Sequence, residues 1–175
     1  MIIWLNGPFG AGKTTVANLL LEADPNLAVF DTEQIGYALS HALRTKLPVD
    51  DFQDWASWRR LVVAALAEIS AELQTDIVVP QTVLVEKYWR EIADGLAERD
   101  VELRAVTLHV DTAEHTRRIT NDCAEADAAQ WRLKRRDDYD AALTWLASAT
   151  TVIDTTTLTP EVSASVVRTI VNRRS

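Results

Sequence analysis

The residues best suited to do chemistry lie near the start of the chain, where spaced glycines lead into a lysine and two threonines. Gly7, Gly12, Lys13 and Thr14 fit the pattern G-x-x-x-x-G-K-[ST], and Gly10 adds another glycine. Glycines let the backbone fold so that its N–H groups point at phosphate oxygens, the lysine supplies a cation, and the threonine hydroxyl is a ligand for Mg²⁺. The pattern predicts a P-loop that binds a nucleoside triphosphate with Mg²⁺ on Thr14. The residues expected to hold the nucleotide are Gly7, Pro8, Phe9, Gly10, Ala11, Gly12, Lys13, Thr14 and Thr15.

The residues on both sides of this pattern support that prediction. Residues 1–5 are an apolar run typical of a buried strand, and residues 14–22 have a helical pattern. A helix that begins at this point turns its positive N-terminal end toward the same anion. The alternative is a chance glycine turn between a strand and a helix, and the two flanks together favour the P-loop.

Two carboxylates, Asp31 and Glu33, follow the next short apolar run, residues 27–31. Ligands of parallel sheets bind outside the carboxyl ends of the strands, where Asp31 could accept a proton from a substrate hydroxyl or hold Mg²⁺ through water. The alternative is that Asp31 caps the following helix and that Glu33 is an ordinary charge in its first turn. We take Asp31 as the candidate base and leave both roles open for Glu33.

The third predicted strand ends in VVPQT, without the acidic residue that motor-type ATPases carry at this place. Gln81 or Thr82 could hold a water bound to Mg²⁺, but neither supplies charge, so the acidic role falls on Asp31. The side chains expected to contact an acceptor are Asp31, Glu33, Arg59, Gln81 and Thr82.

Arginines gather in the last third of the chain, where they could clamp a transferred phosphoryl group. Arg117 and Arg118 end one predicted helix, and helical spacing puts Arg132, Arg135 and Arg136 on one face of the next. The alternative is a solvated face balanced by the nearby run DDYD. The residues expected to act in catalysis are Lys13, Asp31, Arg118, Arg132 and Arg136.

Strands and helices alternate along the whole chain. Strands are predicted at residues 1–5, 27–31, 76–84, 102–110 and 151–155, and helices at residues 14–22, 33–47, 52–74, 87–100, 112–122, 131–148 and 159–172. This order predicts one domain over residues 1–175 with a three-layer α/β P-loop kinase fold, in which helices cover both faces of a five-stranded, mainly parallel sheet. By analogy with small P-loop kinases, residues from about 34 to 60 would form an acceptor-binding region, and residues from about 117 to 136 would form a lid.

Composition excludes several classes of protein. The chain has 175 residues, a net charge of −8 and a pI near 4.9, which disfavours a general nucleic-acid binder. No apolar run approaches the roughly 20 residues of a membrane span, and no secretory signal is present. Cys123 is the only cysteine, which fits a cytoplasmic protein. The sequence does not decide the oligomeric state.

Several segments together resemble the tunicamycin-resistance protein family, small P-loop proteins with a fold similar to that of nucleoside monophosphate kinases. They are WLNGPFGAGKT, FDTEQIGYAL, DDFQ, SWR, IVVPQTV and VTLHV, and Phe9 and Pro80 make the match more specific. The resemblance runs from Met1 to about Ile119 and resumes weakly at Trp131, Lys134 and Asp137.

This resemblance implies ATP as the nucleotide and phosphoryl transfer to tunicamycin, a nucleoside antibiotic that resembles a UDP-sugar. Asp31 and Glu33 fall on the acidic motif of the family. The chain departs from the family after Arg118, where relatives tend to carry further arginines and this chain has Thr120, Asn121 and Asp122.

The expected function is an ATP-dependent phosphotransferase for a small nucleoside-like or antibiotic acceptor, which could confer tunicamycin resistance. Two alternatives stay open. One is a protein that binds ATP and sequesters the antibiotic or a nucleotide-sugar without turnover. The missing acidic residue after the third strand is the reason to retain this alternative. The other is a nucleoside monophosphate kinase.

Overall fold

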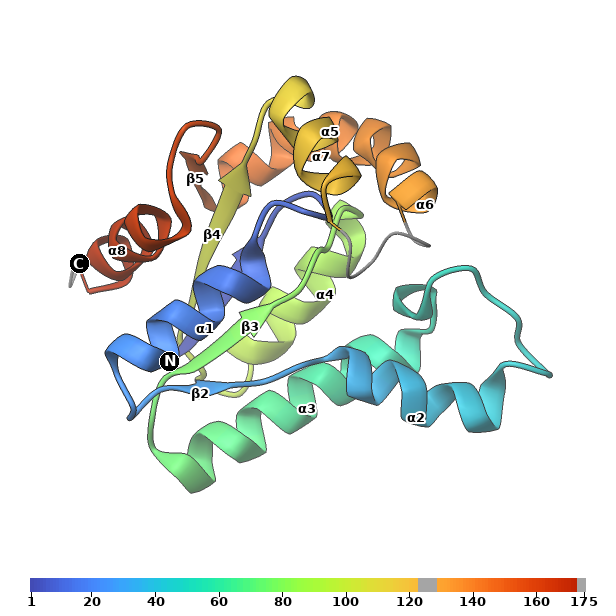
Figure 1. Cartoon of the computed structure of the whole chain (residues 1–175). Coiled ribbons are helices and arrows are strands. Elements are labelled where there is room, and N and C mark those ends of the chain that lie inside the picture. Colours follow the sequence, from blue (N-terminus) through green and yellow to red (C-terminus); the bar gives the residue numbers. More distant parts are fainter. Residues whose placement is uncertain (123–128, 173–175) are drawn as a thin grey trace.

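The chain is built around one parallel β-sheet, shown in Figure 1 by a computed structural model that describes residues 1–122 and 129–172. The strand order is β2-β3-β1-β4-β5, and all pairings are parallel. The strands are β1 (Ile2–Asn6), β2 (Ala28–Val29), β3 (Ile77–Pro80), β4 (Leu103–His109) and β5 (Thr151–Asp154). The predicted five-stranded parallel sheet is confirmed.

Helices cover both faces of this sheet and rise above one edge of it (Figure 1). One face carries α1 (Lys13–Ala23) and α8 (Pro160–Val171), and the other carries α3 (Ala56–Leu73), α4 (Glu86–Ala97) and α7 (Arg136–Ala149). Outside α3 lies α2 (Glu33–Leu43), and the carboxyl edge carries the 3-10 helix η1 (Phe52–Asp54), α5 (Thr112–Thr120) and α6 (Ala129–Lys134). The expected three layers are therefore present. Among the described residues, no helix has the length and apolar character to cross a membrane.

The central strand β1 shows how the sequence fixes this arrangement. All five of its residues are buried, because the strand is covered on both faces. Ile3 and Leu5 pack with α1 and α8, whereas Ile2 and Trp4 point the other way and pack with α3 and α4. A strand held in this way gives the loop that follows it a rigid point of departure.

Three predicted elements have different limits in the structure. The helix expected over residues 52–74 is divided into η1 and α3, because Trp55 is extended and donates from its indole N–H to the Leu47 carbonyl at 2.9 Å. The strand expected over residues 76–84 ends at Pro80. The helix expected over residues 131–148 is divided at Arg135, which lies between α6 and α7.

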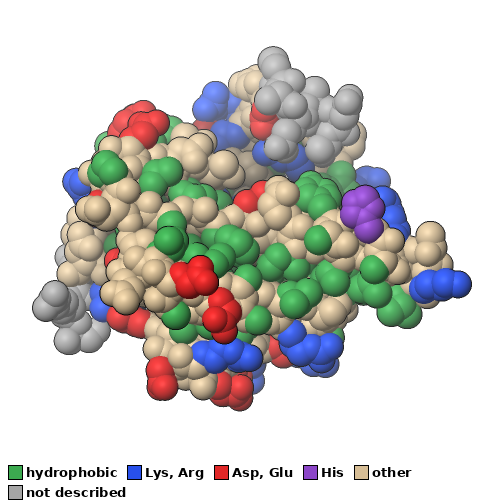
Figure 2. Space-filling model, turned by 90° about the horizontal axis from the view of Figure 1, so that it is seen from below, with side chains coloured by type: hydrophobic (Ala, Val, Ile, Leu, Met, Phe, Trp, Pro, Cys, Tyr) green, Lys and Arg blue, Asp and Glu red, His purple; other side chains and the backbone are tan. Residues whose placement is uncertain are grey.

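Hydrophobic side chains are also exposed on the face that Figure 2 shows, which is the lower side of the molecule in Figure 1. The large hydrophobic residues exposed on α2, on α3 and on the segment between them are Tyr37, Leu47, Leu61 and Leu73. Of these four side chains, only Tyr37 also lines the main cavity of the molecule. This face is therefore mostly separate from the candidate site.

Candidate nucleotide and acceptor site

The loop between β1 and α1 has the backbone geometry of a P-loop. Gly7, Gly10 and Gly12 have φ angles of +134°, +81° and +88°, a region that favours glycine. A Cβ at Gly7 would also lie 2.5 Å from the Leu108 carbonyl oxygen in β4. The glycines predicted from the motif are thus required by the conformation, and Gly7 is required by packing as well.

Lys13 is held within the loop that precedes it. Its ammonium donates to the carbonyls of Pro8 at 2.8 Å and Gly7 at 3.2 Å, and it lies 5.6 Å from the centre of the Phe9 ring. The side chain is 9% exposed. The cation is therefore positioned by the loop itself, at the N-terminus of α1, where an anion is favoured.

The segment after β3 is tied to the beginning of the P-loop. The buried Asn6 side chain accepts from the backbone N–H groups of Gly7 at 2.8 Å and Val83 at 3.0 Å, and it donates to the Val83 carbonyl. The hydroxyl of Thr82 donates to the Gly7 carbonyl at 2.9 Å. Gln81, which accepts from the Thr32 hydroxyl at 2.7 Å, extends this network to the beginning of α2. Gln81 and Thr82 are thus brought next to the P-loop, as the sequence predicts.

A cavity of about 990 Å³ opens over the P-loop. Its floor is formed by residues of the loop and α1, and its walls come from α2, the segment after β3, α5, α6 and the segment that leads into α8. Outside the loop and α1, the residues that line it are Glu33, Tyr37, Phe52, Pro80, Gln81, Thr82, Glu114, Arg117, Arg118, Asp122, Trp131, Arg132, Leu158, Thr159, Pro160 and Ser163. The volume is that of a small-molecule site.

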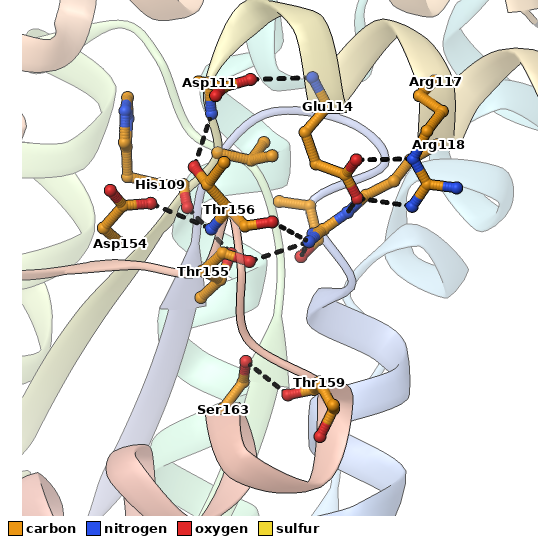
Figure 3. Close-up of polar contacts among 12 residues, drawn as sticks. His109, Asp111, Glu114, Arg117, Arg118, Asp154, Thr155, Thr156, Thr159 and Ser163 are labelled. Atoms are coloured by element: carbon orange, nitrogen blue, oxygen red, sulfur yellow. Dashed lines mark hydrogen bonds and ion pairs between the residues drawn. The ribbon is translucent and has the colours of Figure 1, made fainter.

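Arg118 connects three parts of the cavity wall, as Figure 3 shows. Its guanidinium donates to Glu114 at 2.8 Å and to the Thr155 carbonyl at 2.8 Å, and its longer contact to the Ala11 carbonyl measures 3.5 Å. Hydrogen bonds from Arg117 and Arg118 lower the pKa of Glu114 to about 2. The carboxylate thus stays ionised and holds both arginines at the cavity.

A buried histidine joins α5 to the P-loop. The Nε2–H of His115 donates to the Phe9 carbonyl at 2.7 Å. Burial is the main cause that lowers the pKa of this imidazole, so it is neutral near pH 7, and its Nδ1 is buried without a hydrogen bond among the described residues. No motif in the sequence predicts this contact, because a single histidine on a helix does not indicate a partner 106 residues away.

The arginines expected on one helix face have different partners. Arg132 pairs with Asp122 at 2.8 Å and lines the cavity close to Gly10. Arg135 instead pairs with Asp51 at 2.7 Å. Arg136 is 8% exposed, bonds to the Val110 carbonyl and Asp140, and is absent from the described cavity lining. Of the three, only Arg132 therefore lies at the P-loop cavity, and a joint catalytic role for them stays a prediction.

The structure separates the two carboxylates that follow β2. Asp31 is exposed and accepts from the Glu33 backbone N–H at 2.9 Å and from the Gln34 side chain at 2.9 Å. Its carboxylate bonds to the first backbone N–H of α2 from the position before the N-cap residue, Thr32, which is close to its alternative role, whereas Glu33 lines the cavity. A catalytic role for Asp31 stays a prediction, and Glu33 is the better placed carboxylate.

Arg59 lies beside the site without lining the described cavity. Its guanidinium pairs with Glu91 at 2.6 Å, bonds to the Gln53 carbonyl and stacks 4.0 Å from the centre of the Tyr88 ring. These contacts fix η1 against α4. Part of the expected lid, residues 123–128, lies outside the described residues.

The donor set fits a nucleotide triphosphate with Mg²⁺. Backbone N–H groups, Lys13 and the end of α1 would hold the phosphates, and Thr14 would give the metal one ligand. Among the described residues, no group of three His, Cys, Asp or Glu side chains could hold a metal ion by itself. Most ligands of Mg²⁺ would then be phosphate oxygens and water, as is usual for this ion.

Some lining residues were missed by the sequence analysis. Trp131 packs edge-on against Phe9 with ring centres 4.7 Å apart, and Ser163 enters from the first turn of α8. These residues are distant from the motif in the sequence. Only the strand order brings them to the P-loop.

Comparison with solved structures supports this description of the fold. A tunicamycin resistance protein from Deinococcus radiodurans matches with a TM-score of 0.74 and 28% identity, covering 98% of this chain and 95% of that one. A sugar kinase from a Janibacter species matches with a TM-score of 0.69 and 17% identity, covering 98% and 94%. The shikimate kinase of Acinetobacter baumannii, in complex with shikimate, matches with a TM-score of 0.67 and 18% identity, covering 99% and 95%.

The resemblance to tunicamycin-resistance proteins and the P-loop kinase fold are therefore both confirmed. A comparison with curated proteins gives no match. A protein-family model described as an AAA domain matches residues 2–146, which is most of the chain. The chain belongs to this AAA domain family.

Proposed function

We propose that this protein is an ATP-dependent phosphotransferase that acts on a hydroxyl group of a small molecule. The observation that carries the proposal is the position of Lys13, whose ammonium lies in a P-loop at the floor of a cavity of about 990 Å³. The same cavity reaches Glu33, Tyr37 and Gln81 on the side away from α8. It therefore offers room for an acceptor beside the phosphates.

In the proposed reaction, an oxygen of the acceptor hydroxyl forms a bond to the γ-phosphorus. The bond from that phosphorus to the β–γ bridging oxygen breaks, and ADP leaves. Lys13, Arg118 and Arg132 stabilise the charge on the transferred group, and the hydroxyl proton passes to a carboxylate. We assign this last role to Glu33 because it lines the cavity, and Gln81 and Thr82 orient the acceptor. The acceptor is a nucleoside-like or antibiotic compound, for which the solved tunicamycin resistance protein is the guide.

A mass-spectrometric turnover assay tests this proposal. The protein is mixed with Mg-ATP and a panel of tunicamycin, UDP-sugars, nucleosides, amino sugars and nucleoside monophosphates. We expect a phosphorylated product that Lys13→Ala reduces about 100-fold or more, because the variant loses a cation that stabilises the transferred group. Lys87→Ala, which removes an exposed lysine of α4, is the matched control. A product that forms equally well in Lys13→Ala would refute the assignment.

Substitution of the two carboxylates separates their roles. We expect Glu33→Gln to lower kcat more than Asp31→Asn, because Glu33 lines the cavity whereas Asp31 is engaged at the helix end. The comparison is made at saturating ATP, with circular dichroism to check folding. If Asp31→Asn were the more damaging variant at equal stability, Asp31 would be the base, as first predicted.

Sequestration without turnover is the second candidate function. It is favoured by the end of β3, where the polar residues that follow are Gln81 and Thr82 and no carboxylate among residues 77–85 supports the metal. Stoichiometric binding of tunicamycin without any phosphorylated product over many equivalents of ATP would select this alternative.

A further inference from the structure

A second cavity, of about 510 Å³, lies on the other side of the segment that follows β3. It is bordered by η1 and the two residues before it, by the start of α4, and by Arg135 with the first turns of α7. The residues that line it are Phe9, Asp50, Asp51, Gln53, Asp54, Thr82, Leu84, Val85, Glu86, Tyr88, Arg135, Asp138, Ala141, Ala142 and Trp145. We call it the acidic cavity.

The acidic cavity adjoins the place where phosphate is expected. Phe9 and Thr82 line both this cavity and the one over the P-loop. Thr82 bonds to the Gly7 carbonyl, and the Phe9 ring lies 5.6 Å from the ammonium of Lys13. A molecule in the acidic cavity would therefore have its nearest part beside the P-loop.

The balance of charge differs between the two cavities. The nucleotide cavity is lined by four cations, Lys13, Arg117, Arg118 and Arg132, and by three carboxylates, Glu33, Glu114 and Asp122. The acidic cavity has five carboxylates and a single cation, Arg135. That cation is engaged by Asp51 at 2.7 Å and by Asp138 at 3.1 Å, so its charge is already compensated.

Two of the remaining carboxylates, Asp50 and Asp54, are exposed at the mouth of the cavity, whereas Glu86 is paired with Arg90 at 2.5 Å. Asp54 accepts from the Tyr88 hydroxyl at 2.9 Å, which leaves further acceptor sites on its oxygens. Carboxylates of this kind accept hydrogen bonds from hydroxyl and ammonium groups, and they repel phosphate.

Aromatic rings supply the apolar part of the same cavity. Tyr88 is fixed by Arg59, which stacks on its ring, and Trp145 packs against Trp89 with ring centres 6.5 Å apart. Fixed rings beside hydrogen-bond acceptors suit a ring-shaped ligand with an apolar face and a polar edge.

We propose that the acidic cavity binds the part of the acceptor beyond its reacting hydroxyl, which extends past Thr82 to Glu33 in the P-loop cavity, and that this part is polyhydroxylated and carries an amine cation and no anionic group. The assignment rests on the proposed phosphotransferase function. It separates the two substrates by charge, with the triphosphate over the P-loop and the acceptor among the carboxylates. A nucleoside monophosphate is disfavoured, because its phosphate would meet uncompensated negative charge.

Calorimetric titration with charge-matched probes tests the proposal. The protein is first saturated with Mg²⁺ and a non-hydrolysable ATP analogue, so that the P-loop cavity is filled. The probes are neamine, which is a cationic aminoglycoside fragment, cellobiose, which is neutral, and UMP, which is anionic. We expect neamine to bind most tightly and UMP at least about 10-fold more weakly, since a cleft lined mainly by negative charges favours a cation over an anion.

Two double variants locate the binding site. Asp50→Asn with Asp54→Asn removes two charges from the mouth of the acidic cavity and should weaken neamine binding about 10-fold. Glu68→Gln with Glu72→Gln removes the same charge from the exposed side of α3 and should leave the affinity within about 2-fold. Circular dichroism and the affinity for the ATP analogue check that both variants are folded.

Three results would overturn the proposal: no binding of neamine, tighter binding of UMP than of neamine, or equal loss of affinity in the two double variants. Because the experiment measures binding alone, it fails independently of the kinase assignment. Neamine that binds as expected, with no phosphorylated product from neamine or from any acceptor in the turnover assay, would remove the kinase function and keep the site. A phosphorylated anionic acceptor in the turnover assay would keep the kinase and remove the charge selection.

Discussion

At the scale of single residues, the site depends on backbone conformation as much as on side chains. Gly7 is held between Asn6, which accepts from its N–H, and Thr82, which donates to its carbonyl. Its φ of +134° and its closeness to the Leu108 carbonyl exclude any side chain. Gly12 has a positive φ as well, but a Cβ there would meet no atom within 4 Å.

This difference between two glycines of one motif can be measured. We expect Gly12→Ala to cost about 1–2 kcal/mol of unfolding free energy, because only the left-handed conformation is strained. Gly7→Ala should cost clearly more, because its Cβ would lie 2.5 Å from a backbone oxygen that cannot move without the sheet. Urea denaturation of the two variants gives the comparison. Equal losses would show that strand β4 yields to the added methyl group.

The sequence predicts those site residues whose roles are written in local spacing. The glycines, Lys13 and the neighbouring threonines follow from one motif, because strand, loop and helix are consecutive. The contacts of Arg59 and Arg136 could not be predicted, because each depends on a partner distant in the sequence: Glu91 for Arg59 and the Val110 carbonyl for Arg136. For Asp31 the local pattern allowed two roles, and its carboxylate bonds to a nearby backbone N–H. A charged side chain in a suggestive position is not yet a ligand.

At the scale of elements, α5 connects two parts of the cavity wall, the P-loop and the segment after β5. His115 reaches the P-loop from one side of this helix, and Arg118 reaches the segment after β5 from its last turn. The groups with charge around His115 are Arg132, Arg136 and Asp140, of which the two arginines lower its pKa further. Burial and the two arginines thus outweigh the Phe9 hydrogen bond, which by itself raises the pKa of His115, and the folded protein favours the neutral imidazole.

Acid should weaken the protein through this histidine. Its pKa in the folded chain is below the ordinary value of 6.5, so the unfolded state binds more protons between these two values. The contribution to stability is complete above pH 6.5 and is lost as the pH falls toward the folded pKa. We expect the unfolding free energy to fall between pH 7.5 and 5.5 by less than about 1.4 kcal/mol per pH unit from this group.

His115→Gln is the matched variant, since its amide N–H can still donate to the Phe9 carbonyl and does not titrate. The fall in unfolding free energy between the two pH values should be smaller in the variant than in the wild type. Identical pH profiles would show that His115 does not carry the effect.

Element limits depend on contacts that a periodic pattern does not contain. Helical spacing continues through Trp55 and Arg135, yet Trp55 has an extended backbone and Arg135 separates α6 from α7. At Trp55 the indole binds the Leu47 carbonyl, and at Arg135 the guanidinium binds Asp51. Pro80 ends β3 because the following backbone turns to bind Asn6.

At the scale of the whole molecule, the class of fold was predictable and the strand order required the structure. Alternating strands and helices with apolar runs buried on both sides indicate a parallel sheet. That β1 lies between β3 and β4 is a fact of tertiary pairing. This order brings the P-loop, Gln81 and Thr82 together, and it places α5 beside them.

The charges of the whole chain also acquire a meaning that composition lacks. A net charge of −8 says only that general nucleic-acid binding is disfavoured. In the folded chain one cavity is lined by more cations than carboxylates, and the next by more carboxylates than cations. Two substrates of opposite charge would thus bind at separate sites of one small protein.

The two ends of the described chain lie near the amino ends of the strands, on the side of the sheet remote from both cavities. The amino group of Met1 pairs with Asp76, directly before β3, and the Val171 carbonyl at the end of α8 accepts from Arg104 at the start of β4. A fluorescent protein or an affinity tag joined at either end would therefore lie on the side of the sheet opposite to the two cavities. Immobilisation on a sensor surface through such a tag would leave the openings directed into solution, so that ligand capture can be followed without rebuilding the molecule.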